Sequence, residues 1–301
     1  MTTHPTGDQY EITFQEQRAV VTEVGATLRV YSVDGRDVIS GFAEDAVIKG
    51  GRGNQLLPWP NRIRDGQYTF KGVPQQLDLS EPKRHNAIHG LARHVAWDLM
   101  DFTGDSVTQR VRIYPQSGWP GTLEASITHT LSSGGLEVKV SATNIGSTAL
   151  PFGYAAHPYF TVGEDVVDDI VLELPAGSYL EVDDRLLPVR LSPVEGTDKD
   201  FRSPHALGSV GLDTAFTDLA RDPDGRARVK LTLGNRYAEM WADQTMGWLQ
   251  VFTGDERRDI ALAVEPMTCG PNAFNPGPTE ADVVVLEPGQ SFLGRWGVVG
   301  R

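Results

Sequence analysis

Short runs in which apolar and polar residues alternate recur along the whole chain and limit what it can fold into. Clear examples lie at residues 11–14, 107–114, 123–131, 136–144 and 228–233. Alternation at every second residue is the pattern of a β-strand that buries one face. No window of about 11 to 18 residues keeps an apolar stripe at the helical period of 3.6. The chain is therefore predicted to be an all-β protein with very little helix.

Turn residues separate these runs at short intervals. Asp34-Gly35 is a strong hairpin signal, and Ser132-Ser133-Gly134-Gly135 separates two long alternating runs. Strands joined by tight turns pair antiparallel. With 301 residues, the expected fold is one large antiparallel β-sandwich domain over residues 1–301, and two tandem half-size sandwiches are the alternative. Residues 281–286 end in a wholly apolar run and are predicted to form a strand buried on both faces.

The charge balance narrows the classes of ligand. With 27 Lys and Arg against 40 Asp and Glu, the formal net charge is -13, which disfavours binding to nucleic acid or to an anionic membrane. A neutral or cationic small ligand fits this charge better. The one cysteine, Cys269, cannot form an internal disulfide. Because neither an export signal nor a run of about 18 apolar residues is found, a cytoplasmic protein that does not enter the membrane is expected.

A titratable imidazole stands among aromatic rings in the stretch Gly153-Tyr154-Ala155-Ala156-His157-Pro158-Tyr159-Phe160. Pro158 biases His157 away from the helical region, so this histidine is expected on extended backbone. Tyr154, Tyr159 and Phe160 are expected to form largely apolar walls around it. His157 is thus a candidate for proton transfer, and a core histidine bonded to backbone is the alternative.

Glu265 is the clearest local sign of acid-base chemistry after His157. It follows the apolar residues Ala261-Leu262-Ala263-Val264 and precedes Pro266. At the end of a buried strand this carboxyl is expected to be partly desolvated, with its pKa raised toward the range of a general base. The alternative is a strand-end carboxylate that reaches solvent.

Other polar residues stand among aromatic residues, Pro and Gly. Arg62 follows Pro58-Trp59-Pro60-Asn61 and offers a forked donor to oxygen atoms, with a surface arginine as the alternative. Trp59 is either a platform for the apolar face of a ligand or a core residue. His89 precedes Gly90, where backbone is able to approach a ligand closely. Asp213 has apolar neighbours, as a buried paired carboxylate or a turn-capping aspartate would.

His85 and His89 are four residues apart, the spacing of a zinc pair on a helix. The β pattern around them and Gly90 predict a loop instead, and no Glu follows the first His as in the zinc-protease motif. No metal site is predicted. The sequence also lacks a phosphate-binding Gly loop, a GxSxG elbow and a CxxC pair, so neither nucleotide chemistry nor covalent serine catalysis is expected.

Taken in order, these stretches resemble the aldose 1-epimerase (galactose mutarotase) family. The matching segments are Asn61-Arg62-Ile63, Ile88-His89-Gly90, His157-Pro158-Tyr159-Phe160, Leu212-Asp213-Thr214-Ala215-Phe216 and Val264-Glu265-Pro266. Each segment alone is weakly specific, but all of them in this order, over most of the chain, are specific. The resemblance implies a large antiparallel β-supersandwich that binds a sugar in an open cleft on its concave face.

The resemblance also implies roles for the residues. Glu265 corresponds to the general base that takes the proton of the anomeric hydroxyl, and His157 to the general acid that protonates the ring oxygen. His89 and Arg62 correspond to residues that bind the sugar and polarise its oxygens, and Asp213 to the acid that accepts from its hydroxyls. The implied reaction opens a free hexose such as glucose or galactose to the aldehyde and recloses it on the other carbonyl face. No cofactor is implied, and a monomer or homodimer is expected.

Two alternatives to this function stay open. Relatives acting on hexose 6-phosphates tend to differ where this chain has Asn61-Arg62-Ile63, but Arg64 and Arg84 leave a phosphosugar substrate open. A non-catalytic carbohydrate-binding protein on the same fold would not need both His157 and Glu265. The segment 267–275 is expected to influence the shape of the pocket, and with it the choice of sugar.

Overall fold

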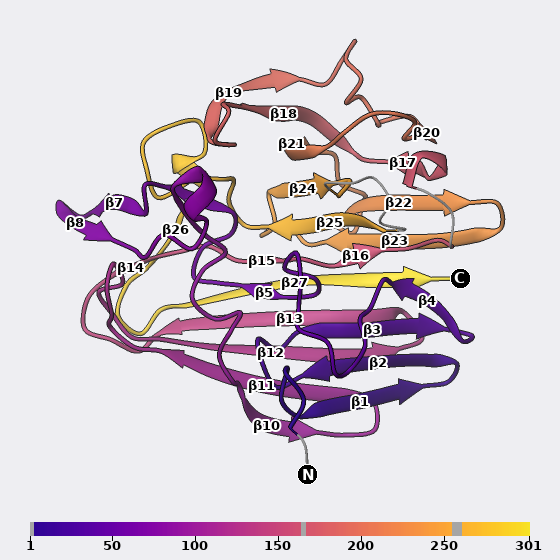
Figure 1. The fold of residues 1–301 in the computed structure, drawn as a ribbon, viewed down its shortest axis with the longest axis horizontal. Helices are drawn as coiled ribbons and strands as arrows, with labels where there is room; N and C mark the ends of the chain where they lie inside the picture. Colours follow the sequence, from indigo (N-terminus) through magenta and orange to yellow (C-terminus); the bar gives the residue numbers. More distant parts are fainter. Residues whose placement is uncertain (1–2, 164–166, 255–260) are drawn as a thin grey trace.

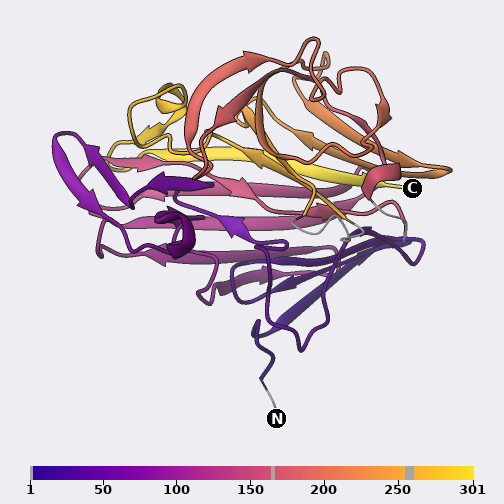
Figure 2. The same cartoon turned by 45° about the horizontal axis from the view of Figure 1, so that its top comes forward.

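The computed structural model of the protein describes residues 3–163, 167–254 and 261–301. Within these ranges nearly all regular structure is strand, which confirms the all-β prediction. In the part of the chain that the structure describes, helical structure is limited to 3-10 turns at Pro82–Arg84, Val167–Asp169 and Glu280–Asp282. Two large antiparallel sheets pack against each other (Figures 1 and 2), and small two-stranded sheets lie beside them.

The larger sheet contains strands from the first to the last part of the chain. Its strands are β1 (Gln9–Phe14), β2 (Gln17–Thr22), β3 (Leu28–Val33), β4 (Arg36–Ile39), β5 (Gln55–Leu56), β15 (Ala155–Ala156), β16 (Tyr159–Phe160), β18 (Ala176–Val182), β19 (Pro188–Pro193), β21 (Asp213–Leu219), β24 (Trp248–Phe252) and β25 (Leu262–Met267). Their order is β1-β2-β3-β4-β16-β25-β24-β21-β18-β19, and β15 pairs with both β25 and β5.

The second sheet also combines early and late strands. Its members are β10 (Asp98–Phe102), β11 (Ser106–Ile113), β12 (Leu123–Ser132), β13 (Gly135–Asn144), β17 (Val171–Glu173), β20 (His205–Ala206), β22 (Ala227–Leu233), β23 (Arg236–Ala242) and β27 (Ser291–Gly300), in the order β10-β11-β12-β13-β27-β23-β22-β17-β20. Both sheets therefore draw strands from distant parts of the chain.

Three strand pairs stand outside the large sheets. They are β6 (Arg62–Arg64) with β9 (Asn86–Ile88), β7 (Gln67–Phe70) with β8 (Val73–Gln76), and β14 (Leu150–Phe152) with β26 (Val284–Leu286). The first pair carries two of the candidate binding residues next to the larger sheet, with Arg62 in β6 and His89 directly after β9.

Local turn chemistry is confirmed at the first hairpin, where Asp34 and Gly35 have φ of 52° and 70° between β3 and β4. The prediction for residues 281–286 is wrong. A 3-10 turn ends at Asp282, and β26 pairs only with β14. In the described residues β26 has one neighbouring strand, and it is not covered on both of its faces. Val285 is therefore 43% exposed rather than buried.

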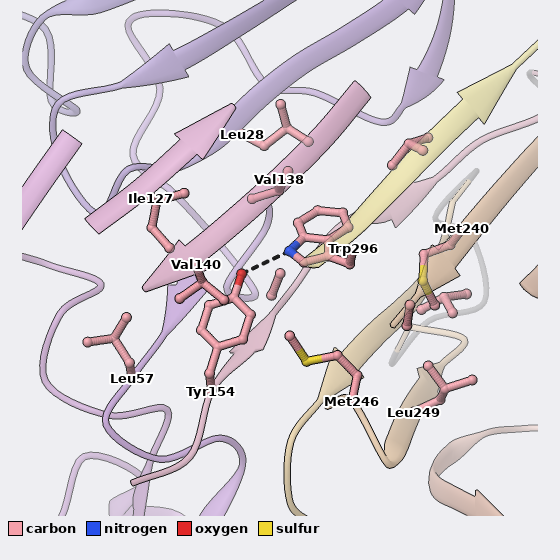
Figure 3. Close-up of a cluster of buried hydrophobic side chains, with 14 of the residues drawn as sticks. Leu28, Leu57, Ile127, Val138, Val140, Tyr154, Met240, Met246, Leu249 and Trp296 are labelled. Carbon is pink, nitrogen blue, oxygen red and sulfur yellow. Dashed lines mark hydrogen bonds between the residues drawn. The ribbon is translucent and has the colours of Figure 1, made fainter. Parts of the chain in front are cut away.

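The main core fills the space between the two sheets and fixes the stretch that contains His157 (Figure 3). Tyr154 is fully buried there; its hydroxyl accepts a hydrogen bond from Nε1 of Trp296 on β27 at 2.9 Å and donates one to Oε1 of Gln55 at 2.6 Å. A buried tyrosine with both hydrogen bonds made is held in one orientation. The chain is therefore fixed in the core three residues before His157.

Candidate active site

Sheet register brings His157 and Glu265 together. Strand β25 pairs with both short strands that flank His157, through Ala155 with Met267 and Tyr159 with Ala263. His157 therefore lies opposite Glu265, and its Nε2 is 3.3 Å from Oε1 of the carboxyl. The backbone of His157 bonds that of Gly53 and Asn54, so this residue is extended as predicted.

Two further polar side chains continue this row across the sheet. Gln250 of β24 pairs with Glu265, and Ala215 of β21 pairs with Gln250. Asp213, two residues before Ala215, lies on the same face because side chains alternate along a strand. Nε2 of Gln250 donates to Oδ1 of Asp213 at 2.5 Å, and Nδ2 of Asn61 donates to Oε1 of Gln250 at 3.3 Å. The row thus spans four neighbouring positions of the larger sheet.

The same alternation separates the site from the core. Leu262 and Val264 of β25 belong to the main core, whereas Glu265 faces the other side of the sheet. Contrary to the sequence prediction, Glu265 does not end its strand: β25 continues to Met267 with its register unbroken through Pro266. Proline is compatible with an extended backbone and costs only one hydrogen-bond donor.

Arg62 enters from the small β6–β9 sheet with its guanidinium already paired. Its Nε and Nη2 donate to the carboxylate of Glu81 at 2.9 and 3.1 Å, and Nη2 is 3.9 Å from Oδ2 of Asp213. Arg62 is 8% exposed. A fork held on one carboxylate has a fixed direction, so Arg62 presents its charge to the cleft at a defined place.

His89 lies beside His157 on a strained backbone. Its φ is 64°, its N–H donates to the carbonyl of Asn61 at 2.9 Å, and its ring meets that of His157 edge to face with centroids 5.5 Å apart. Its Nδ1 is buried without a partner among the residues that the structure describes. His85, the other histidine of the rejected zinc pair, is exposed and contacts Asp65 at 2.9 Å instead.

All five candidate residues line one cleft of about 320 Å³, within the range of roughly 300–1,000 Å³ typical of small-molecule sites. These are Arg62, His89, His157, Asp213 and Glu265. Of the three aromatic walls predicted for His157, only Tyr159 lines the cleft, with its ring stacked on the imidazole at 5.1 Å. Tyr154 and Phe160 pack in the main core, because the sheet has two faces and they lie on the inner one.

Two more sequence predictions concerned the walls of this cleft. Trp59 is buried in the main core, where its ring meets the edge of Phe274 at 6.3 Å, so the core alternative is correct. None of the residues 267–275 lines the cleft; Asn272 and Asn275 line a different depression. The segment after Glu265 therefore does not form a wall of the cleft itself.

Burial moves the pKa values of the central pair in opposite directions. Desolvation raises the pKa of Glu265 well above its usual value, nearby Asp213 adds to this, and Arg62 opposes it. Desolvation lowers the pKa of His157 to about 4. Burial also raises the pKa of Asp213 and lowers that of His89 well below the usual value. These shifts together favour a neutral imidazole with a protonated carboxyl, which places the one proton of the pair on Glu265.

The backbone at Gly51 lies close to the imidazole ring of His157. Gly51 has φ of +69°, and a Cβ built there would lie 3.0 Å from Cδ2 and 3.4 Å from Nε2 of His157. Gly51 also lines the cleft, next to Gly50, whose carbonyl accepts a hydrogen bond from the hydroxyl of Tyr159 at 3.1 Å. The backbone of this loop therefore takes the place of a side chain against the ring.

Replacing Gly51 by alanine is expected to lower turnover by displacing His157. The added methyl must push the ring by a few tenths of an ångström, and small misplacements of reacting groups cost up to about 10²-fold. Gly35→Ala is the matched control, since Gly35 has φ of +70° with nothing within 4 Å. Both variants should lose about 1–2 kcal/mol of stability to the left-handed backbone, but only Gly51→Ala should disturb a reaction that depends on His157. Equal activities of the two variants would contradict the contact.

Several residues of the cleft are not among those predicted from the sequence. Gln250 is a polar residue inside the otherwise apolar run Trp248-Leu249-Gln250-Val251-Phe252, which is a usable signal. The glycines at positions 50, 51 and 53 are another, because three positive φ values within four residues indicate a close approach of backbone. No feature of the sequence around Glu81 indicates a site, because Glu81 takes part in the site through its ion pair with Arg62.

In residues 3–163, 167–254 and 261–301, no group of three or more His, Cys, Asp or Glu side chains is placed to hold a metal ion. Over the same ranges, no helix is long and apolar enough to cross a membrane.

Known proteins match this combination of fold and cleft. The aldose 1-epimerase family profile matches residues 8–296, and the chain belongs to this family. An uncharacterised protein of Escherichia coli K12, YihR, is 31% identical over 291 residues, covering 95% of this chain and 91% of that protein. Galactose mutarotase of the rat is 28% identical over 276 residues, covering 82% of this chain and 78% of the rat protein.

Solved structures show the same fold. Galactose 1-epimerase from Lactobacillus acidophilus superposes with a TM-score of 0.80 at 20% identity, covering 100% of this chain and 97% of the other. A galactose mutarotase-like protein from Clostridium acetobutylicum gives 0.87 at 18% identity, covering 97% and 94%. The predicted mutarotase-like β-sandwich is therefore confirmed.

Proposed function

We propose that the protein is an aldose 1-epimerase that interconverts the α and β anomers of a free hexose such as glucose or galactose. The observation that carries this proposal is the direct contact between the buried His157 and Glu265 at the base of a sugar-sized cleft. The names of galactose mutarotase in the rat and galactose 1-epimerase in Lactobacillus acidophilus support it. A protein that only binds sugar has no need of such a pair.

The proposed reaction moves one proton through the sugar. Glu265 as carboxylate takes the proton of the anomeric hydroxyl while His157 as imidazolium gives its proton to the ring oxygen. The bond between the anomeric carbon and the ring oxygen breaks, and the aldehyde forms. After rotation about the bond between the first two carbons, the roles reverse and the ring closes on the other face. Atoms and protons balance without a cofactor.

The same pair is able to hold its proton in either of two arrangements. Imidazolium with carboxylate starts ring opening, and neutral imidazole with carboxylic acid starts ring closure. Burial favours the neutral arrangement, whereas the positive charge of Arg62 lowers the pKa of Glu265 and so favours the charged one. Because the two effects oppose each other, the proton is poised to move in both directions, as a reversible reaction requires.

Arg62, His89 and Asp213 are proposed to hold the sugar over this pair. Arg62 and His89 would donate to oxygens of the ring and its hydroxyls, and Asp213 would accept from hydroxyls. Its Oδ1 already accepts from Gln250, which fixes the carboxylate in the cleft. We further propose a monomer or homodimer acting in the cytoplasm.

The pH dependence of kcat/KM follows from the proton count of the pair. The active pair holds one proton. Because burial lowers the pKa of His157 to about 4, a second proton binds only as the pH falls toward 4. Because burial raises the pKa of Glu265 well above its usual value, the remaining proton leaves only at a pH well above the ordinary range of a carboxyl.

We therefore expect kcat/KM to stay level from neutrality down to mildly acidic pH and to fall as the pH approaches 4. The measurement is polarimetry on glucose across pH, with the spontaneous rate subtracted and folding checked by circular dichroism. A half-maximal point near the ordinary histidine pKa of about 6.5 would contradict the buried pair.

The proposed function itself is tested by polarimetry on freshly dissolved α-glucose and α-galactose. Purified protein at micromolar concentration should speed the approach to the equilibrium rotation in proportion to its concentration. Relaxation no faster than in buffer, together with tight sugar binding by calorimetry, would instead make the protein a carbohydrate-binding protein.

A further inference from the structure

A row of hydrogen bonds connects Arg62 in the cleft with Arg185 outside it. The carboxylate of Glu81, which holds the guanidinium of Arg62, also accepts from Nδ2 of Asn86 at 3.0 Å. Oδ1 of Asn86 accepts from Nη2 of Arg185 at 3.2 Å, and its Nδ2 also donates to the carbonyl of Arg185 at 3.2 Å. Because Asn86 is fully buried and both ends of its amide are bonded, it links Arg185 to Glu81 in one fixed orientation.

The guanidinium of Arg185 is bonded to the chain just before and at the start of β9. Its Nε donates to the carbonyl of Arg84 at 2.9 Å. Its Nη2 donates to the carbonyl of His85 and to Oδ1 of Asp65, both at 2.8 Å. An exposed ion pair alone contributes about 0–1 kcal/mol, but two of these acceptors are backbone carbonyls. Arg185 therefore fixes the path of the chain at residues 84–86.

Arg185 itself projects from a tight turn between β18 and β19, at the edge of the larger sheet. Oδ1 of Asp183 accepts from the N–H groups of Arg185 and Leu187 at 2.9 and 3.0 Å. The N–H of Asp183 donates to the carbonyl of Leu187 at 2.9 Å, and the side chain of Leu187 is fully buried. Because this turn is bonded within itself and anchored by a buried side chain, it supports Arg185 rigidly.

These contacts tie the small sheet of β6 and β9 to the larger sheet. In the described residues β6 and β9 pair only with each other, whereas β19 belongs to the larger sheet through β18, which pairs with β21. The two sheets meet in the cleft, where Nη2 of Arg62 is 3.9 Å from Oδ2 of Asp213 on β21. The place of the small sheet against β21 sets this distance, and Arg185 holds the small sheet from outside.

We propose that Arg185 is a positioning residue of the cleft: acting through Asn86 and Glu81, it fixes the guanidinium of Arg62 where a sugar binds. The inference rests on the proposed function where it concerns the sugar, whereas the placement of Arg62 is a property of the protein alone. A displacement of about 1 Å at a reacting or binding group costs up to about 10²-fold in rate. Loss of Arg185 is therefore expected to slow the reaction although Arg185 does not line the cleft.

The NMR signal of the Nε–H of Arg62 measures this placement without any sugar. The signal is assigned by its absence from the variant Arg62→Lys. This Nε–H donates to Glu81 at 2.9 Å from a mostly buried side chain, so its exchange with water is expected to be slow. Arg185→Gln should shift the signal and speed its exchange by about 10-fold, the value of one hydrogen bond to a charged group.

Arg190→Gln is the matched control for this measurement. Arg190 lies on β19 of the same hairpin, in an exposed pair with Glu181 at 3.0 Å, and it does not line the cleft. Its replacement removes the same charge and should leave the signal of Arg62 unchanged. A signal that also stays unchanged in Arg185→Gln overturns the inference.

Anomer exchange followed by NMR on glucose and galactose measures the effect on the reaction. Arg185→Gln should lower kcat/KM by about 10- to 100-fold, with a melting temperature close to that of wild type. Arg190→Gln should retain the wild-type rate. Because the effect passes through Arg62, adding Arg185→Gln to Arg62→Lys should cost little more than Arg62→Lys alone. Losses that multiply, or an unchanged rate in Arg185→Gln, overturn the positioning role.

Two provisions keep this experiment decisive. If Arg185→Gln melts below the assay temperature, Arg185→Lys takes its place in both measurements, since it keeps a positive charge beside Asp65 but lacks the fork. If the wild-type protein accelerates neither sugar, the proposed function fails. The signal of the Nε–H of Arg62 then still decides whether Arg185 holds Arg62.

Discussion

Glu265→Gln is expected to lower kcat/KM for anomer interconversion by about 10²- to 10⁴-fold, the usual contribution of a positioned general base. The amide has nearly the shape of the protonated carboxyl that burial favours, but it cannot accept the proton of the anomeric hydroxyl. Its neighbours also suit an amide: Gln250 pairs with position 265 in the sheet, and Nε2 of His157 is 3.3 Å from Oε1. The variant should therefore fold normally, and its loss should appear in kcat.

Glu124→Gln is the matched control for this substitution. Glu124 lies on β12 in an exposed pair with Arg112, on the second sheet. Exposed pairs contribute about 0–1 kcal/mol, so this variant should retain its rate within twofold and its melting temperature within a few degrees. If Glu265→Gln retained full activity in polarimetry, Glu265 would not be the base.

His157→Asn is the second large effect, again expected at about 10²- to 10⁴-fold in kcat/KM. The amide keeps a hydrogen-bonding group toward Glu265 but is unable to give a proton to the ring oxygen. The acid limb of the pH profile, attributed to His157 with its pKa of about 4, should disappear with the imidazole. Loss of this limb separates a catalytic role from a merely structural one.

The double variant gives the sharpest test of a shared proton. Groups that act as one unit show strongly non-additive losses. Glu265→Gln with His157→Asn should therefore be only slightly slower than either single variant, and multiplied losses would mean that the two residues act independently. His85→Asn serves as control, because His85 is exposed and contacts Asp65 away from the cleft.

The predictability of the fold depends on how local each signal is. The strand β12 follows the alternating run at residues 123–131, and its burial alternates along the whole strand. The hairpin at Asp34-Gly35 is equally local. The prediction for residues 281–286 was wrong because an apolar run does not show whether strands will pair on both of its sides. In the described residues β26 pairs with β14 alone. Local periodicity predicts a strand, but not the sheet around it.

The predictability of the site follows the same division. The residues proposed as acid and base have strong local surroundings, with His157 before a proline and Glu265 after an apolar run. Glu81 has none, because its place in the site is defined by the guanidinium of Arg62 that it binds. Tyr154 and Phe160 appeared to be walls because sequence proximity does not distinguish the two faces of a sheet.

The sequence by itself determined that this chain is an antiparallel β protein of the aldose 1-epimerase family, and it identified five polar residues that line one cleft. Alternation, turn residues and ordered motifs are local properties, so they can be read without a structure. Only the tertiary structure decided that His157 lies opposite Glu265, because strand register joins positions more than a hundred residues apart. Only the structure showed that Glu81 holds the guanidinium of Arg62, since whether a charge has a partner depends on the segments that meet it in space.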